Sequence, residues 1–82
     1  MDIRALVGAN IRRIRLLRGL SQEALATDAD MAPSFLSQIE NGKRGPTIVT
    51  IDAVAKALDV PVVDLFAEPQ QEPKGLPRGI RT

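Results

Sequence analysis

The 82-residue chain carries 11 lysines and arginines against 10 aspartates and glutamates, and it contains neither cysteine nor histidine. These absences exclude a disulfide framework and a thiolate metal site, and they remove the most common general base. No apolar run is long enough to cross a membrane, so we expect one small cytosolic domain with no cofactor and no contact with a membrane.

The first predicted element is an amphipathic helix over residues 2–18, because Val7, Ile11 and Ile14 recur at helical spacing. Arg15 lies at the edge of this apolar stripe, where a free charge would be poorly placed. Glu40 is the carboxylate with which we expect it to pair. Residues 1–20 hold five arginines against one aspartate, which favours an anion-binding face, although ordinary surface charge explains the pattern equally well.

Residues 21–41 predict two short helices joined by a tight turn. Ser21 suits the cap of the first helix, and Pro33 suits the first position of the second. Asp30 falls where the turn needs a left-handed residue, which aspartate tolerates well. Leu36 and Ile39 share one face of the second helix and should point into the core. The opposite face is short, polar and almost uncharged, which is typical of a surface that hydrogen-bonds a partner.

The remaining chain predicts two more helices. Thr50, with Thr47 as the less favoured choice, should cap a fourth helix after a loop over residues 42–46. A short fifth helix is expected from Val62 to Phe66. Its residues Val62, Val63 and Phe66 are too apolar to be buried within so small a domain, so they predict a dimer interface. The prolines and glycines of residues 67–82 predict an extended tail after a domain over residues 1–66.

Several motifs together resemble the Cro and phage-repressor type of helix-turn-helix protein. They are Gly19-Leu20-Ser21-Gln22-Glu23, Leu25-Ala26, Ser34 to Arg44, Pro46 and Ala55-Lys56-Ala57-Leu58. The resemblance covers roughly residues 6–66. It implies an all-α, compact five-helix bundle of the phage-repressor DNA-binding type, which binds a palindromic operator in double-stranded DNA as a homodimer. Asp30, Ala32 and Ala24 depart from the pattern, which usually has glycine, a capping Ser or Thr, and an acidic residue there.

The resemblance also implies roles for individual residues, with the second helix of the motif lying in the major groove. The residues expected to read bases are Pro33, Ser34, Ser37 and Gln38. Gln38 is the strongest of them, because its amide can pair bidentately with adenine. The residues expected to bind phosphate are Gln22, Asn41, Lys43, Arg44 and Arg13.

A sequence-specific transcriptional regulator is therefore the favoured function. It could be a restriction–modification controller, a prophage repressor or an antitoxin, and the small size favours a controller with no small-molecule ligand. The alternative is a protein-interaction module that uses the same fold to hold a partner such as a toxin, and RNA polymerase is another candidate partner. Without histidine, cysteine, a phosphate-cradling glycine loop or paired inward carboxylates, we expect no enzymatic activity.

Overall fold

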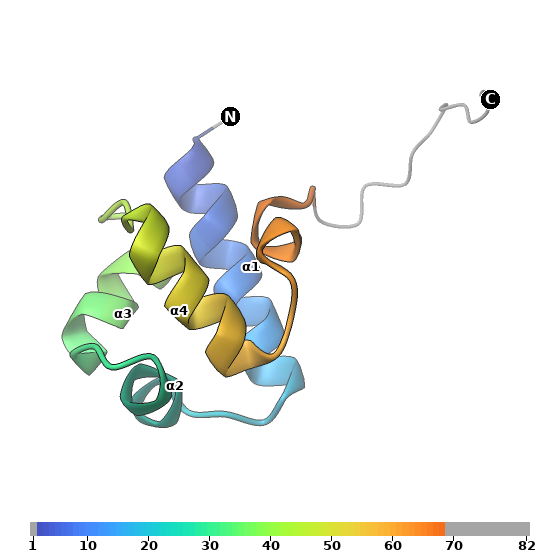
Figure 1. Ribbon diagram of the computed structural model, residues 1–82. Coiled ribbons are helices and arrows are strands. Elements are labelled where there is room, and N and C mark those ends of the chain that lie inside the picture. Colours follow the sequence, from blue (N-terminus) through green and yellow to red (C-terminus); the bar gives the residue numbers. More distant parts are fainter. Residues whose placement is uncertain (1, 69–82) are drawn as a thin grey trace, which may run out of the picture.

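The computed structural model describes residues 2–68, and over this range the chain forms four α-helices followed by one 3-10 helix (Figure 1). They are α1 (Ile3–Leu17), α2 (Gln22–Asp28), α3 (Pro33–Glu40), α4 (Ile48–Leu58) and η1 (Val62–Phe66). The all-α class is confirmed, but the fifth α-helix is wrong. Five residues after a proline are too few for a stable α-helix, and the tighter 3-10 form is the usual one for such short pieces. The tail predicted for residues 67–82 lies outside the described residues from residue 69 onward.

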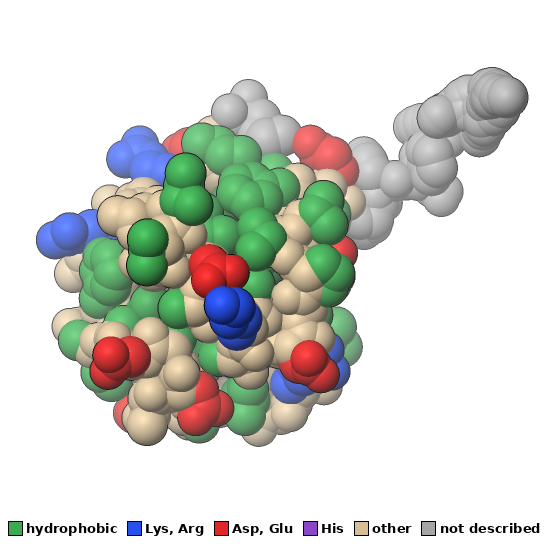
Figure 2. Space-filling model, viewed as in Figure 1, with side chains coloured by type: hydrophobic (Ala, Val, Ile, Leu, Met, Phe, Trp, Pro, Cys, Tyr) green, Lys and Arg blue, Asp and Glu red, His purple; other side chains and the backbone are tan. Residues whose placement is uncertain are grey.

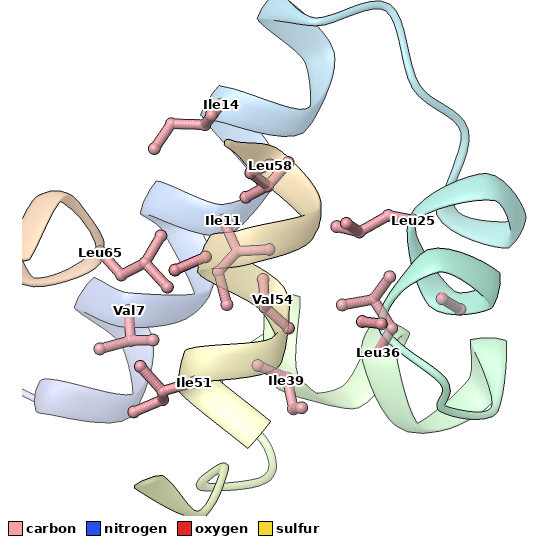
Figure 3. Packing of buried hydrophobic residues seen from close by; sticks show 13 residues of the cluster. Val7, Ile11, Ile14, Leu25, Leu36, Ile39, Ile51, Val54, Leu58 and Leu65 are labelled. Carbon is pink, nitrogen blue, oxygen red and sulfur yellow. The ribbon is translucent and has the colours of Figure 1, made fainter. Parts of the chain in front are cut away.

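The helices enclose one aliphatic core (Figure 3). Helix α1 packs against both α3 and η1, while α2 packs against α3 and α4. The buried apolar side chains come from every element and are Val7, Ile11, Ile14, Leu25, Ala26, Ala29, Leu36, Ile39, Ile51, Val54, Ala55, Leu58 and Leu65. None of the helices in residues 2–68 has the length and apolar character needed to cross a membrane.

Two left-handed residues set the directions of α2 and α3. Gly19 has φ +72°, and the next N–H, of Leu20, donates to the Arg15 carbonyl oxygen at 3.0 Å, which closes the end of α1. Asp30 has φ +59°, and the following Met31 N–H donates to the Ala26 carbonyl oxygen at 2.9 Å. The left-handed conformation predicted for Asp30 is confirmed, and the turn places α3 across the end of α2.

The start of α4 differs from the favoured prediction. Thr47, not Thr50, is the N-cap, and its hydroxyl oxygen accepts the Thr50 backbone N–H at 3.1 Å. Either threonine could cap a helix, so the pattern alone does not decide between them. The earlier start adds Ile48 and Val49 to the helix, and both side chains are exposed in its first turn.

Gly8 allows α1 and α3 to cross closely. A Cβ atom at this position would overlap the carbonyl oxygen of Ile39 and lie 2.8 Å from that of Glu40. Both obstacles are backbone atoms at the end of α3, so neither can rotate away. The crossing therefore depends on the absence of a side chain in the middle of α1.

We expect Gly8→Ala to destabilise the protein, although alanine is the better helix former. Overpacking a core typically costs about 1–3 kcal/mol of stability, and the overlap with backbone atoms places this site at the upper end. The gain in helix propensity from glycine to alanine is only roughly 1 kcal/mol, so the cost is larger. Urea denaturation would measure the change. Ala9→Gly, at the exposed neighbouring position, is the control and should lose roughly 1 kcal/mol from propensity alone. A more stable Gly8→Ala protein would refute the close crossing.

Candidate nucleic-acid interface

Helix α3 presents a short polar face to solvent. Pro33 is its first residue, and Pro33, Ser34 and Gln38 are exposed, whereas Ser37 is half-buried. Leu36 and Ile39 on the opposite side are fully buried, so the core fixes the rotation of the helix. Three of the four residues predicted to read bases thus lie together on an open surface, and Ser37 lies at its edge.

The loop after α3 folds back onto the helix that it leaves. Gly42 has φ +74°, and the backbone N–H groups of Lys43 and Arg44 both donate to the Gln38 carbonyl oxygen, at 2.9 and 3.3 Å. Asn41 is exposed at the C-cap with φ −89°, so only the glycine of the Asn41-Gly42 pair is left-handed. The fold-back places two exposed cations beside the polar face of α3.

Arg44 also contacts the side chains of that face, which was not predicted. Its Nε donates to the Gln38 Oε1 at 3.0 Å, and its Cζ lies 5.5 Å from the centre of the Phe35 ring. This distance is within the range of a cation–π interaction. The spacing of residues 35, 38 and 44 carries no signal for the cluster, because the loop conformation alone brings Arg44 back.

A buried ion pair joins α1 to α3. Glu40 accepts Arg15 Nε at 2.7 Å and Nη2 at 3.0 Å, and Arg15 Nη1 donates to the Leu20 carbonyl oxygen at 2.8 Å. The side chains are 8% and 1% exposed. The hydrogen bond to the Glu40 carboxylate raises the pKa of Arg15, so the guanidinium stays charged. Arg15 and Glu40 therefore form the expected pair, which fixes α1 against α3.

Gln22 belongs to the same cluster. Its Nε2 donates to the Glu40 Oε1 at 3.0 Å, so the carboxylate accepts hydrogen bonds from both α1 and α2. Gln22 is half-buried at the first position of α2. The Gln22 amide, which is predicted to bind phosphate, thus donates one N–H to Glu40 and has a second N–H available for another acceptor.

The two central arginines of α1 differ in their surroundings. Arg13 Nη2 donates to the Asn10 Oδ1 at 3.2 Å, and the buried Asn10 amide in turn holds the backbone near the end of η1. Arg12 is exposed and lines a shallow hollow with Arg13, Glu40 and Asn41. Arg12 was not among the predicted site residues, although its position next to Arg13 in a basic segment could have drawn attention to it.

A second surface is apolar. Val62, Val63 and Phe66 are exposed, and Ile3, Ile48 and Val49 add further exposed apolar area. In Figure 2 hydrophobic side chains, coloured green, gather over the beginning of α4, the start of α1 and η1. We call Ile3, Ile48, Val49, Val62, Val63 and Phe66 the apolar patch. A hollow within it is lined by Ile48, Val49, Val62 and Phe66 together with Ile51 and Asp52.

A sequence profile described as "Helix-turn-helix" matches residues 11–65, about two thirds of the chain. The chain belongs to the XRE-type helix-turn-helix family. The matched range runs from the middle of α1 into η1 and includes the whole polar face and its loop.

Known relatives agree with this family. The chain is 39% identical over 75 residues to the uncharacterised HTH-type transcriptional regulator y4dJ of Sinorhizobium fredii, covering 92% of this chain and 97% of that one. It is 40% identical over 66 residues to control protein C.BamHI of Bacillus amyloliquefaciens, covering 79% and 82%. The crystal structure of the restriction–modification controller C.AhdI of Aeromonas hydrophila superposes with a TM-score of 0.75 at 35% identity, covering 77% and 96%.

Membership of the XRE-type family confirms the resemblance read from the sequence, and it makes the chain a DNA-binding helix-turn-helix transcriptional regulator. In such proteins the second helix of the motif enters the major groove. That helix is α3, the element with the exposed, uncharged polar face.

Proposed function

We propose that this XRE-type regulator binds a palindromic operator as a homodimer, with α3 of each protomer in the major groove. The observation that carries the proposal is the face of α3. It exposes Pro33, Ser34 and Gln38, bears no charge of its own, and is flanked by Lys43 and Arg44. Neutral polar side chains such as glutamine and serine can read base edges, and phosphates attract the neighbouring cations.

The proposed phosphate contacts surround the base-reading face. Lys43 and Asn41 are exposed at the end of α3, and Arg12 lies beside Asn41 at the hollow between α1 and α3. The Gln22 amide has one N–H left to offer from the start of α2. Arg13 is a weaker candidate, because its guanidinium already donates to Asn10. Each cation that neutralises a phosphate adds affinity that depends on salt but not on sequence.

The apolar patch supports the dimer. Six apolar side chains would otherwise remain in water on a domain of this size, and a second copy covers them by a two-fold contact. Two recognition helices then require half-sites spaced about 34 Å, one turn of DNA, apart. The similarity to control protein C.BamHI and to the controller C.AhdI supports a controller-type regulator.

Selection of DNA sequences by the purified protein tests the proposal. We expect a palindromic consensus whose binding weakens steeply with salt, with a slope of roughly 0.9 in log affinity per log salt for each phosphate contact. Gln38→Ala should lose preference at one base position per half-site, at a cost of about 1–3 kcal/mol in discrimination. Titration of the selected site at two salt concentrations measures both effects.

Two outcomes would contradict the proposal. Enrichment of no sequence at low salt would mean that the chain does not act as a sequence-specific regulator. A consensus that Gln38→Ala leaves unchanged at every position would mean that α3 does not read bases through this residue.

A further inference from the structure

Gln38 is not a free glutamine. Its side chain is exposed on α3, yet its Oε1 accepts the Nε–H of Arg44 at 3.0 Å. A guanidinium can only donate hydrogen bonds, so the oxygen of the amide must face Arg44 and the nitrogen must face outward. The orientation of the Gln38 amide is thus determined by a residue outside the helix.

Arg44 is held in place by contacts between its loop and α3. Its backbone N–H donates to the Gln38 carbonyl oxygen at 3.3 Å, and the neighbouring Lys43 N–H donates to the same oxygen at 2.9 Å. Its guanidinium lies over the ring of Phe35, which is itself half-buried. The planar guanidinium is suited to bonding an amide while stacking on a ring, whereas a lysine ammonium is not.

Because its oxygen faces Arg44, Gln38 turns the donor end of its amide toward a ligand. The outward group is the amide N–H₂, which carries two donors. Pairing with adenine in the major groove needs one donor and one acceptor, but the Gln38 oxygen faces Arg44 and already gives it one of its two lone pairs. Guanine presents two acceptors there, N7 and O6.

We propose that Arg44 is a specificity-determining positioning residue, which holds the Gln38 oxygen so that Gln38 reads guanine instead of adenine. The inference rests on the proposed role of α3 in the major groove. It replaces the adenine preference that the sequence predicts for an unrestrained glutamine at this position.

Selection of DNA sequences by four versions of the 82-residue chain tests the inference. Wild type and Gln38→Ala together identify the base position that Gln38 contacts, since its preference disappears in the variant. Arg44→Met removes the donor to Gln38 and keeps a side chain of similar length. Lys43→Met removes the same charge from the same loop, where no side-chain contact to Gln38 exists. Circular dichroism confirms that all four proteins are folded.

We expect wild type and Lys43→Met to select guanine at that position, although the affinity of Lys43→Met falls. Arg44→Met should select adenine, with the ratio of adenine to guanine binding shifting by roughly 5- to 150-fold. If Arg44 contributed only its charge, Arg44→Met would bind DNA more weakly but would still select the same base at that position.

Three results would overturn the inference. The first is adenine selected by the wild type, and the second is guanine retained by Arg44→Met. The third is loss of all preference in Arg44→Met, which would mean that Arg44 contacts the base itself. Failure of the proposed function is distinguishable, because no sequence would then be enriched by any of the four proteins, and the inference would fall with it.

Discussion

Glu40→Ala is expected to lower the free energy of unfolding by about 3–5 kcal/mol, because it leaves the Arg15 guanidinium charged, buried and unpaired. The Glu40 carboxylate accepts two hydrogen bonds from Arg15 and one from Gln22, so its removal loosens α1, α2 and α3 together. Small domains are stable by only about 5–15 kcal/mol, so the loss is a large part of the total. Urea denaturation followed by circular dichroism measures it.

An exposed ion pair supplies the matched control. Lys56 Nζ lies 3.1 Å from the Asp52 Oδ2, but these side chains are 78% and 51% exposed. Asp52→Ala should cost no more than about 0.5 kcal/mol, because water screens the pair. Equal losses in Glu40→Ala and Asp52→Ala would show that burial of the Arg15–Glu40 pair contributes nothing.

The double variant Arg15→Met/Glu40→Leu separates two explanations of the loss. If the cost of Glu40→Ala comes from the buried Arg15 charge left without a carboxylate, the double variant should be more stable than Glu40→Ala, because no buried charge remains. If the cost comes from lost packing at the helix crossing, the double variant gains nothing over the single one.

Most of the fold could be predicted from the sequence, because its signals are local. The spacing of Val7, Ile11 and Ile14 follows the helical period, and the side chains are buried as that period requires. Asp30 lies between two helical patterns, where only a left-handed residue lets the chain reverse so sharply. The position of Arg15 on an apolar stripe required a partner, and the structure contains the Arg15–Glu40 pair.

The features that escaped prediction depend on contacts between distant residues. The sequence around Gly8 does not reveal that the α3 backbone lies against it, because glycine can occur in a helix without any close contact. Both Thr47 and Thr50 have capping side chains, and the local pattern does not reveal that Thr47 is the N-cap. The Gln38–Arg44 contact exists because the loop after α3 folds back onto the helix, and the loop sequence does not specify that path.

The fifth helix illustrates the same limit. The apolar run from Val62 to Phe66 correctly indicated a short helical segment with side chains left in water, but not its 3-10 geometry. Its position is set by the buried Asn10 amide, which donates to the Leu65 and Ala67 carbonyl oxygens at 2.9 and 2.8 Å. An asparagine inside an amphipathic helix gives no indication of which distant carbonyl groups it will bind.

Val49→Asp is expected to abolish the proposed dimer and to weaken operator binding by about 10²–10⁴-fold. Val49 is 77% exposed within the apolar patch, so an aspartate there need not disturb the folded monomer. In a dimer it would bury a charge against apolar side chains, which is far more costly. The operator affinity falls because two linked half-sites gain about that factor over one. Sedimentation equilibrium and titration of the selected operator measure the two effects.

Leu17→Asp is the control that isolates dimerisation from charge. Leu17 is 76% exposed, almost the same as Val49, but it lies outside the patch at the end of α1. Both variants add one negative charge to the domain, yet only Val49→Asp should dissociate the dimer. If the Val49→Asp protein remained dimeric, the apolar patch could not be the dimer interface. Dissociation with unchanged operator affinity would instead show that one protomer suffices to bind, because the second half-site would then contribute no measurable free energy.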